Sequence, residues 1–186
     1  MKHFYKVASG VLVQPLAHAI ARQPWLWDRN TFRTKFLNTP HSEVSDIWLR
    51  FSDSDKCDTT ARVIGDDHPI WHDAASSLPQ AQSLVLDIMR AVGGYALDRL
   101  LITRLRPGGR IYPHADKDGS YVDDLTRSRY HCVIQGLSGS VYKTGDEEVE
   151  MRTGEVWWFN PWEIHSVYNG SSDDRIHLLI DVRIWP

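Results

Sequence analysis

The chain has 186 residues, of which 42% are hydrophobic and 24% are charged, a length and composition that fit one globular domain with a substantial core. Its net charge of −3 disfavours a nucleic-acid-binding protein, which usually presents a basic face, so no nucleic-acid partner is expected. Two cysteines, Cys57 and Cys132, exclude a disulfide framework, and no apolar run reaches the length of a membrane span, so the sequence predicts a cytoplasmic protein that does not enter a membrane.

The first half of the chain, residues 1–94, is predicted to be a mixed support of helices and a strand. Two segments have a helical pattern: Pro15 lies near the start of the first, where proline is tolerated, and Gly93 follows the end of the second. A β-rich run between them alternates as a strand does and leads into a polar loop. The expected elements are, in chain order, a helix over 11–22, a strand over 46–51, a loop over 52–60 and a helix over 78–92.

After Gly94 the pattern changes to short β-rich runs separated by turn residues, among them Pro107-Gly108-Gly109. Strand-length runs in close succession are typical of a sandwich or barrel. The last run, over 175–184, alternates in a way that predicts one buried face. We therefore expect a mainly β (α+β) protein with a single domain over 1–186, in which a jelly-roll, cupin-like core over 95–186 carries the active site.

The first chemical signal is His114-Ala115-Asp116, which follows a predicted short strand. Residues i and i+2 of a strand point to the same side, so these two side chains can reach one metal ion. His165, at the start of another predicted strand, can supply a third ligand. Two histidines and one carboxylate form the facial triad of non-haem Fe(II) oxygenases, which leaves positions open on the metal. His-x-Asp is common by chance, and the alternative for His165 is a capping or core histidine.

Arg175 lies inside an otherwise apolar predicted strand, where a buried unpaired charge is costly. A carboxylate ligand would supply the missing pair; the alternatives are an ion pair within the chain or an exposed strand end. Arg129 and His131 share a face of another predicted strand, and Thr103 offers a hydroxyl. The alternative for His131 is a hydrogen-bonded core residue, and for Thr103 it is simple β propensity.

Taken in order, these motifs resemble the aspartyl/asparaginyl β-hydroxylase family, a double-stranded β-helix branch of the 2-oxoglutarate oxygenases. The matching strings between Thr103 and Pro186 are ITRLRPGGRIYPH, SRYHCVIQGL, TGEVWWFNPWEIHSVYN and DDRIHLLIDV. The resemblance implies that His114 and His165 bind the metal. The animal peptide hydroxylase of this family has glycine at the position of Asp116, so the aspartate here implies a three-ligand site and weakens the transfer of a peptide substrate.

The same resemblance implies roles for the residues that are expected to contact 2-oxoglutarate. Arg175 matches the residue that binds the distal carboxylate of this co-substrate, and Thr103 matches a hydroxyl residue beside it. Arg129 and His131 match a pair near the other end of the co-substrate.

The resemblance implies an Fe(II)- and 2-oxoglutarate-dependent dioxygenase that uses O2 to hydroxylate a side-chain carbon of an amino acid, free or within a peptide or protein. A demethylase of alkylated nucleobases is disfavoured, because those enzymes carry a second arginine where this chain has Asp181. A non-catalytic cupin-type binding module and an oxygenase of a non-amino-acid small molecule remain as alternatives. The sequence does not indicate an oligomeric state.

Some residues are also candidates for contact with the substrate. His177 fits either a substrate contact or a hydrogen-bonded interior histidine, and Trp162 fits either the pocket mouth or packing. Trp48 and Arg50 are expected on one face of their strand, where Arg50 either receives a substrate carboxylate or is a surface charge at a sheet edge. The polar insert over 117–128 is expected to cover the barrel mouth.

Overall fold

The computed structural model describes residues 2–56, 68–116 and 126–185. Its strands are β1 (Phe4–Ala8), β2 (Val44–Phe51), β3 (Ile70–Trp71), β4 (Gly94–Leu105), β5 (Arg110–His114), β6 (Arg127–Gln135), β7 (Ser140–Thr144), β8 (Glu147–Glu150), β9 (Val156–Phe159), β10 (His165–Asn169) and β11 (Arg175–Ile184). Its helices are α1 (Gln14–Ala21), the 3-10 helix η1 (Pro24–Leu26), α2 (Phe32–Lys35), α4 (Asp73–Ser77) and α5 (Gln80–Val92).

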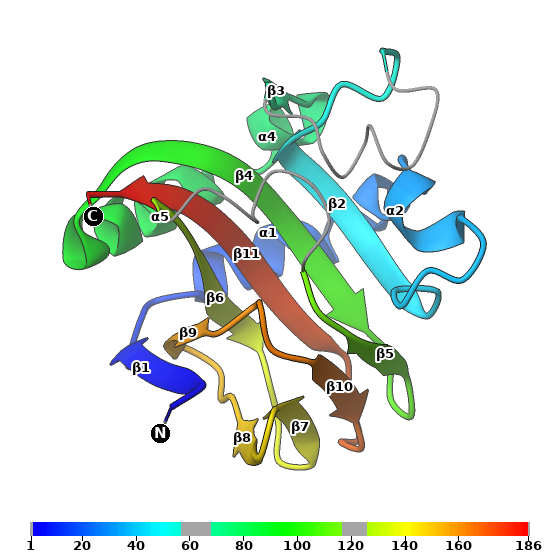
Figure 1. The fold of residues 1–186 in the computed structure, drawn as a ribbon. Coiled ribbons are helices and arrows are strands. Elements are labelled where there is room, and N and C mark those ends of the chain that lie inside the picture. The colour runs from blue at the N-terminus through cyan, green and yellow to red at the C-terminus, as the bar shows by residue number, and fades with distance from the viewer. Residues whose placement is uncertain (1, 57–67, 117–125, 186) are drawn as a thin grey trace.

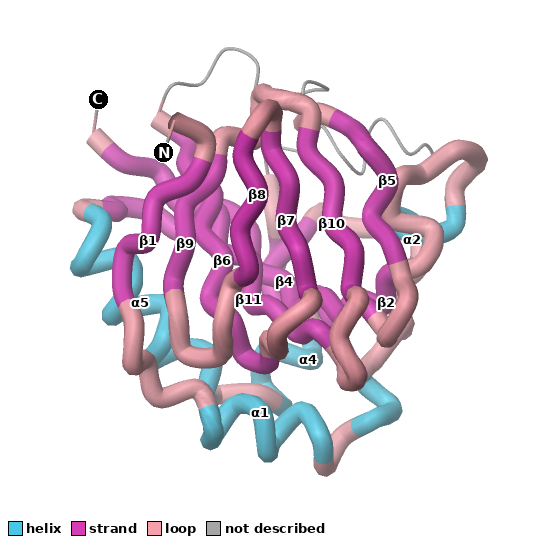
Figure 2. Tube along the Cα trace, turned by 90° about the horizontal axis from the view of Figure 1, so that it is seen from below, coloured by secondary structure: helices cyan, strands magenta, loops and turns pink. Residues whose placement is uncertain are grey.

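These elements form two antiparallel sheets (Figure 1). The larger sheet has seven strands in the order β1-β9-β6-β11-β4-β2-β3, and the smaller has four in the order β5-β10-β7-β8. Figure 2 shows the smaller sheet lying over one face of the larger sheet, with helices α1, α4 and α5 toward the other face and α2 beside β5. Two facing antiparallel sheets with this strand content confirm the predicted mainly β, jelly-roll architecture.

The central strands of the larger sheet divide their side chains between two faces, because alternate residues of a strand point to opposite sides. On the outer face, Ile102 of β4, Cys132 of β6 and Leu178 of β11 pack with Leu16 of α1 and Leu84 of α5 in the main hydrophobic core. On the inner face, toward the smaller sheet, the same strands carry buried polar residues. These are Arg99, Thr103, His131, Arg175, His177 and Asp181, with the partly buried Arg129 beside them.

A second hydrophobic core lies between the two sheets. It contains Phe4, Val133, Tyr142, Trp157 and Phe159, among other residues. The inner face of the larger sheet is therefore apolar over part of its area and polar over the rest. Burying so many polar groups is costly unless they pair with one another or with a ligand, so this polar part of the inner face indicates a functional site.

Both predicted helices are present. Helix α5 buries Leu84 and Ile88, and Gly93 ends it in the left-handed conformation with φ of 69°, which glycine adopts without steric cost. Helix α1 lies within the predicted range and carries proline in its first turn. Within the described ranges, no helix is long and apolar enough to span a membrane.

The strand predicted over 46–51 is present as β2, but a β-bulge changes the face on which its end lies. Trp48 is opposite Leu101 and Arg50 is opposite Leu100, so the register shifts by one residue between the two pairs. Trp48 and Leu101 pack together on the inner face, whereas Leu100 belongs to the helix-side core. Opposite residues share a face, so the expectation that Trp48 and Arg50 lie on one face is wrong.

Candidate metal and co-substrate site

Strand pairing brings the two histidines of the predicted triad together. His114 is the last residue of β5, His165 is the first of β10, and the two are directly opposite in the antiparallel ladder. Their ring centroids are 4.3 Å apart. Asp116 follows β5, and its backbone N–H donates to the carbonyl of Pro161 at 2.9 Å, which fixes the bend that carries its carboxylate.

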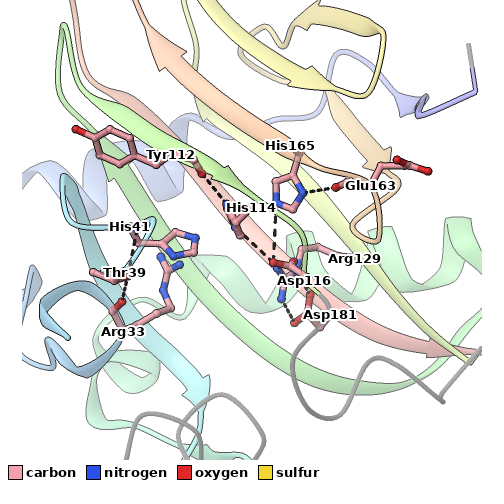
Figure 3. A network of polar contacts seen from close by, with 10 residues as sticks. All are labelled: Arg33, Thr39, His41, Tyr112, His114, Asp116, Arg129, Glu163, His165 and Asp181. Atoms are coloured by element: carbon pink, nitrogen blue, oxygen red, sulfur yellow. Dashed lines mark hydrogen bonds and ion pairs between the residues drawn. The ribbon is translucent and has the colours of Figure 1, made fainter. Parts of the chain in front are cut away.

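Both histidines present the same ring nitrogen to the centre of the site (Figure 3). The Nδ1 of His114 lies 2.8 Å from the carbonyl oxygen of Tyr112, and the Nδ1 of His165 lies 3.0 Å from that of Glu163. A carbonyl oxygen only accepts, so both Nδ1 atoms are protonated and both Nε2 atoms carry the lone pair. Oδ1 of Asp116 lies 3.5 Å from Nε2 of His114 and 3.9 Å from Nε2 of His165.

These three side chains form a donor set suited to a divalent metal. Their ligand atoms all lie within 4.8 Å of one another. Burial lowers the pKa of His165 to about 4, so its ring is neutral at physiological pH. Burial alone would raise the pKa of Asp116, but the positive charge of Arg129 outweighs it and holds that pKa well below its usual range. Two neutral imidazoles and one carboxylate are the ligands of non-haem Fe(II) sites, so the chain has a triad able to bind iron.

Arg129 lies between two carboxylates. Its Nη1 donates to Oδ2 of Asp116 at 2.6 Å, while its Nε and Nη2 donate to the two oxygens of Asp181 at 2.7 and 2.9 Å. Asp181 is opposite Arg129 in the β6–β11 ladder, and its side chain is fully buried. Because Arg129 binds one oxygen of Asp116, the other oxygen is the one presented to the two histidines.

Arg175 is a buried cation. It is 3% exposed, and burial lowers its pKa to about 10, so it is still protonated at neutral pH. Its Nη2 donates to Nδ1 of His177 at 3.1 Å, and its guanidinium lies 5.7 Å from the ring centroid of Tyr142. No carboxylate in the described ranges forms an ion pair with Arg175. The position therefore favours a carboxylate ligand over an ion pair within the chain.

His131 and Thr103 lie beside Arg175. Nδ1 of His131 is 3.2 Å from Nδ1 of His177, and its Nε2 is buried with no hydrogen-bond partner in the part of the chain that the structure describes. Burial, together with the charges of Arg175 and Arg129, holds the pKa of His131 well below its usual value, so the ring is neutral. Thr103 is opposite His177 in the β4–β11 ladder.

Two cavities meet at the triad. The inner cavity, of about 30 Å³, is lined by the residues expected to contact the co-substrate and by both triad histidines; the outer cavity, of about 290 Å³, is lined in part by His114 and Asp116. The residues that line both are Arg33, His41, His114, Arg129 and Leu179.

Arg33 and His41 are site residues that the sequence reasoning missed. The ring centroid of His41 lies 4.8 Å from that of His114. Burial, followed by the charge of Arg33, holds the pKa of His41 well below its usual value. Neither residue belongs to a recognisable motif, and both come from α2 and the segment after it, so only the packing of that segment against β2 reveals them.

The remaining candidates do not line either cavity. His177 is a buried, hydrogen-bonded interior histidine, as the second of the two interpretations of its sequence position predicts. Trp162 is half-buried, and its backbone N–H donates to the side chain of Asn160 at 3.1 Å. Arg50 lies over the ring of Trp71, 5.4 Å from its centroid. Most of the insert expected to cover the mouth, residues 117–125, lies outside the described residues.

Comparison with known proteins finds a relative in sequence. An "L-proline cis-4-hydroxylase" of Rhizobium meliloti (strain 1021) is 33% identical over 81 residues, which are 43% of this chain and 28% of that protein. The chain thus matches less than a third of that relative's length.

Solved structures of low sequence identity share the fold. The prolyl-4-hydroxylase of Pseudomonas putida has a TM-score of 0.54 at 15% identity, over 100% of this chain and 94% of that one. The viral collagen prolyl hydroxylase of Paramecium Bursaria Chlorella virus-1, in complex with 2-oxoglutarate, has a TM-score of 0.54 at 11% identity, over 99% of this chain and 97% of that one. A 2OG-Fe(II) oxygenase family oxidoreductase of Burkholderia pseudomallei has a TM-score of 0.55 at 13% identity, over 90% and 78%.

The sequence model described as "Aspartyl/Asparaginyl beta-hydroxylase" matches residues 39–184. That range covers most of the chain and includes both sheets apart from β1, as well as all three triad residues. The chain therefore belongs to the aspartyl/asparaginyl β-hydroxylase family.

Proposed function

We propose that this chain is an Fe(II)- and 2-oxoglutarate-dependent dioxygenase that hydroxylates a side-chain carbon of an amino acid, free or within a peptide. The observation that carries the proposal is the convergence of the three triad ligand atoms beside the buried guanidinium of Arg175. A triad alone serves many reactions, whereas a triad next to a carboxylate anchor suits one with an anionic co-substrate. The name of the relative from Rhizobium meliloti supports an amino acid as the substrate.

In this proposal His114, Asp116 and His165 hold the iron. The carbonyls of Tyr112 and Glu163 keep each imidazole in the tautomer that presents Nε2. Bound Fe(II), together with 2-oxoglutarate and O2, supplies the oxidation: one oxygen atom enters a C–H bond of the substrate, the other enters succinate, and CO2 leaves. The chain itself contributes the placement of these groups and a pocket that excludes water.

Arg175 is proposed to bind the distal carboxylate of 2-oxoglutarate, with the hydroxyl of Thr103 beside it. His131 and Arg129 are proposed to lie near the other end, and the buried Nε2 of His131 supports this because it has no described partner. The inner cavity, at about 30 Å³, holds only one or two waters. Its lining side chains must therefore move apart when a five-carbon dicarboxylate binds.

Two buried aromatic residues form an apolar wall of the inner cavity. Tyr142 and Phe159 both line it, with ring centroids 6.1 and 5.0 Å from that of His165. An apolar wall lowers the local dielectric, which strengthens the attraction between the guanidinium of Arg175 and a bound carboxylate. These rings thus support tight binding of the co-substrate rather than direct participation in the reaction.

The experiment that tests the proposal couples two measurements on the purified chain with Fe(II), 2-oxoglutarate and O2. Succinate formation is followed while free amino acids, peptides and other small carboxylic acids are offered, and mass spectrometry looks for a gain of one oxygen atom in each. We expect substrate-dependent succinate and an oxygenated product in one class, both abolished in His114→Ala/His165→Ala. If the protein binds Mn(II) and 2-oxoglutarate but forms no succinate with any class, it is a binding module and the proposal is wrong.

A further inference from the structure

The outer cavity has the size and walls of a small-molecule site. Its volume of about 290 Å³ lies at the lower end of the range for small-molecule pockets, which fits a ligand of amino-acid size. Its apolar wall consists of Phe36, Pro40, Phe51, Leu101 and Leu179. A ligand in this cavity would lie beside His114 and Asp116 with an apolar body against those side chains.

The charged residues of the outer cavity give it a basic wall. Among the described residues that line it, Arg33, Arg99 and Arg129 are cations, whereas Asp116 is the single carboxylate. Asp116 is already engaged by Arg129 and belongs to the proposed metal site. Although Asp46 and Asp181 balance the charges of Arg33 and Arg129 from behind, the cavity itself presents charged hydrogen-bond donors, which suit a ligand that carries negative charge.

Arg33 is the best-oriented of these cations. Its Nε and Nη2 each donate to a carboxylate oxygen of Asp46 at 2.8 Å, and the Asp46 side chain is fully buried. Its third nitrogen, Nη1, makes no hydrogen bond to the described residues. A bidentate pair fixes the plane of a guanidinium, so Nη1 is a donor held in place before a ligand arrives.

The position of Arg33 links it to the reaction centre. Arg33 and His41 line both cavities, and the ring of His41 contacts that of His114. Figure 3 shows the guanidinium of Arg33 beside the ring of His41, on the α2 side of the triad. A group bound at Nη1 would thus lie within the outer cavity and close to the metal ligands.

We propose that Arg33, oriented by Asp46 and flanked by His41, binds the carboxylate of a free carboxylic acid of amino-acid size. This inference rests on the proposed function and adds to it the substrate class. A residue inside a peptide has no free α-carboxylate, and the neutral amide in its place offers Nη1 of Arg33 only an uncharged acceptor, which makes a weaker hydrogen bond than a carboxylate does. The outer cavity therefore selects a free apolar amino acid over the same residue in a peptide chain.

The test compares each acid with its own amide. The substrates are L-proline with L-prolinamide, L-leucine with L-leucinamide, and an acetylated, amidated tripeptide with the same residue in the middle. Oxygen gain is measured for the wild type, Arg33→Gln, Arg33→Lys and Arg50→Gln. The last is the matched control, because Arg50 lies on the neighbouring strand but faces away from the cavity.

We expect the wild type to prefer the acid over its amide by about 30-fold or more in kcat/KM. Arg33→Gln should remove most of that preference by lowering kcat/KM for the acid alone, Arg33→Lys should keep part of it, and Arg50→Gln should keep all of it. Mn(II) and 2-oxoglutarate affinities should be unchanged in Arg50→Gln, and the ratio of acid to amide within each variant corrects for any change of these affinities in the Arg33 variants. Because Arg33→Gln leaves Asp46 without its partner, the charge-neutral pair Arg33→Gln/Asp46→Asn should reproduce the loss in a folded protein.

Equal rates for acid and amide, or oxidation of the tripeptide alone, would overturn the inference. A strong acid preference that survives Arg33→Gln would assign the carboxylate to another cation and equally overturn it. Each of these outcomes still involves turnover of 2-oxoglutarate. Failure of the proposed function is distinct, because the wild type would then form no succinate with any of the three substrates.

Discussion

Arg129 and Asp116 are joined by a hydrogen bond of 2.6 Å to Oδ2, the carboxylate oxygen other than the one nearest the two triad histidines. The arginine thereby leaves Oδ1 facing the Nε2 atoms of both histidines, as the oxygen that would hold a metal ion there. Asp181 holds the opposite edge of the same guanidinium through two hydrogen bonds. The three side chains form a row in which a buried carboxylate orients an arginine and the arginine orients a proposed metal ligand.

Arg129→Gln is expected to weaken Mn(II) binding by about 10- to 100-fold, as loss of an outer partner of a metal ligand typically does. Two effects oppose each other here: the variant removes a cation next to the metal, and it also releases the carboxylate of Asp116. The second should dominate, because Asp181 already balances the charge of Arg129. Asp181→Asn should also weaken Mn(II) binding, because it leaves the positive charge of Arg129 less balanced.

Calorimetry with Mn(II) in the absence of 2-oxoglutarate measures this effect. The control is Arg152→Gln, which breaks a surface ion pair with Glu150, and it should change nothing. Metal affinity equal to that of the wild type in both Arg129→Gln and Asp181→Asn would show that the row has no orienting role.

Metal binding should stabilise the folded protein, and the stabilisation should depend on both histidines. At a free Mn(II) concentration 100 times the dissociation constant, the expected gain is about 2.7 kcal/mol in the free energy of unfolding. His114→Ala/His165→Ala should abolish the rise in Tm with added Mn(II), whereas His18→Ala, on the exposed side of α1, should retain it. If the double variant showed the same Mn(II)-induced rise in Tm as the wild type, the metal would bind at another site.

Arg175→Met should change ligand affinity and stability in opposite directions. We expect binding of 2-oxoglutarate to weaken by about 2–5 kcal/mol, the usual cost of removing one partner of a buried charge pair. In the ligand-free protein the same change should raise the free energy of unfolding, because it replaces a buried cation that has no described acidic partner with an apolar side chain of similar length.

Arg175→Lys should recover only part of the 2-oxoglutarate affinity, since an ammonium lacks the bidentate geometry. Anaerobic calorimetry with Mn(II) and chemical denaturation of the apoprotein provide the two measurements. If Arg175→Met bound 2-oxoglutarate as tightly as the wild type does, Arg175 would not be the residue that binds its distal carboxylate.

Two buried histidines should make the folded state sensitive to acid. Burial, with the neighbouring charges, holds the pKa values of His131 and His177 well below their usual range, so both are neutral in the folded protein. The unfolded chain takes up protons at these residues below about pH 6.5, and the folded chain does not. Their stabilising contribution is therefore present at neutral pH and is lost as the pH falls below about 6.5.

His177→Gln should reduce the pH dependence of the free energy of unfolding by about 1.4 kcal/mol per pH unit in that acidic range. Denaturant titrations at a series of pH values from neutral to acidic measure this slope, with His18→Gln as an exposed control. An unchanged slope in His177→Gln would mean that the ring also binds a proton in the folded state.

Much of the fold follows from local patterns in the sequence. The alternation over 175–184 predicted β11, the helical spacing over 78–92 predicted α5, and Gly93 marked the end of that helix. Such patterns are readable because strand and helix geometry depend mainly on residues that are neighbours in the chain. For the same reason, the His114-Ala115-Asp116 motif could be recognised before the position of His165 relative to it was known.

The sequence by itself determined which residue types are available to the site and which face of β11 they share. Arg175, His177 and Asp181 alternate with apolar residues there, and this alternation was also a readable signal that Asp181 faces the same interior as Arg129. What only the tertiary structure decided was how those residues pair. The bulge that turns Arg50 away from the site, and the packing of α2 that places Arg33 and His41 beside the triad, depend on contacts between distant segments. Long-range packing energies of this kind leave no periodic trace in the chain, so no local pattern predicts them.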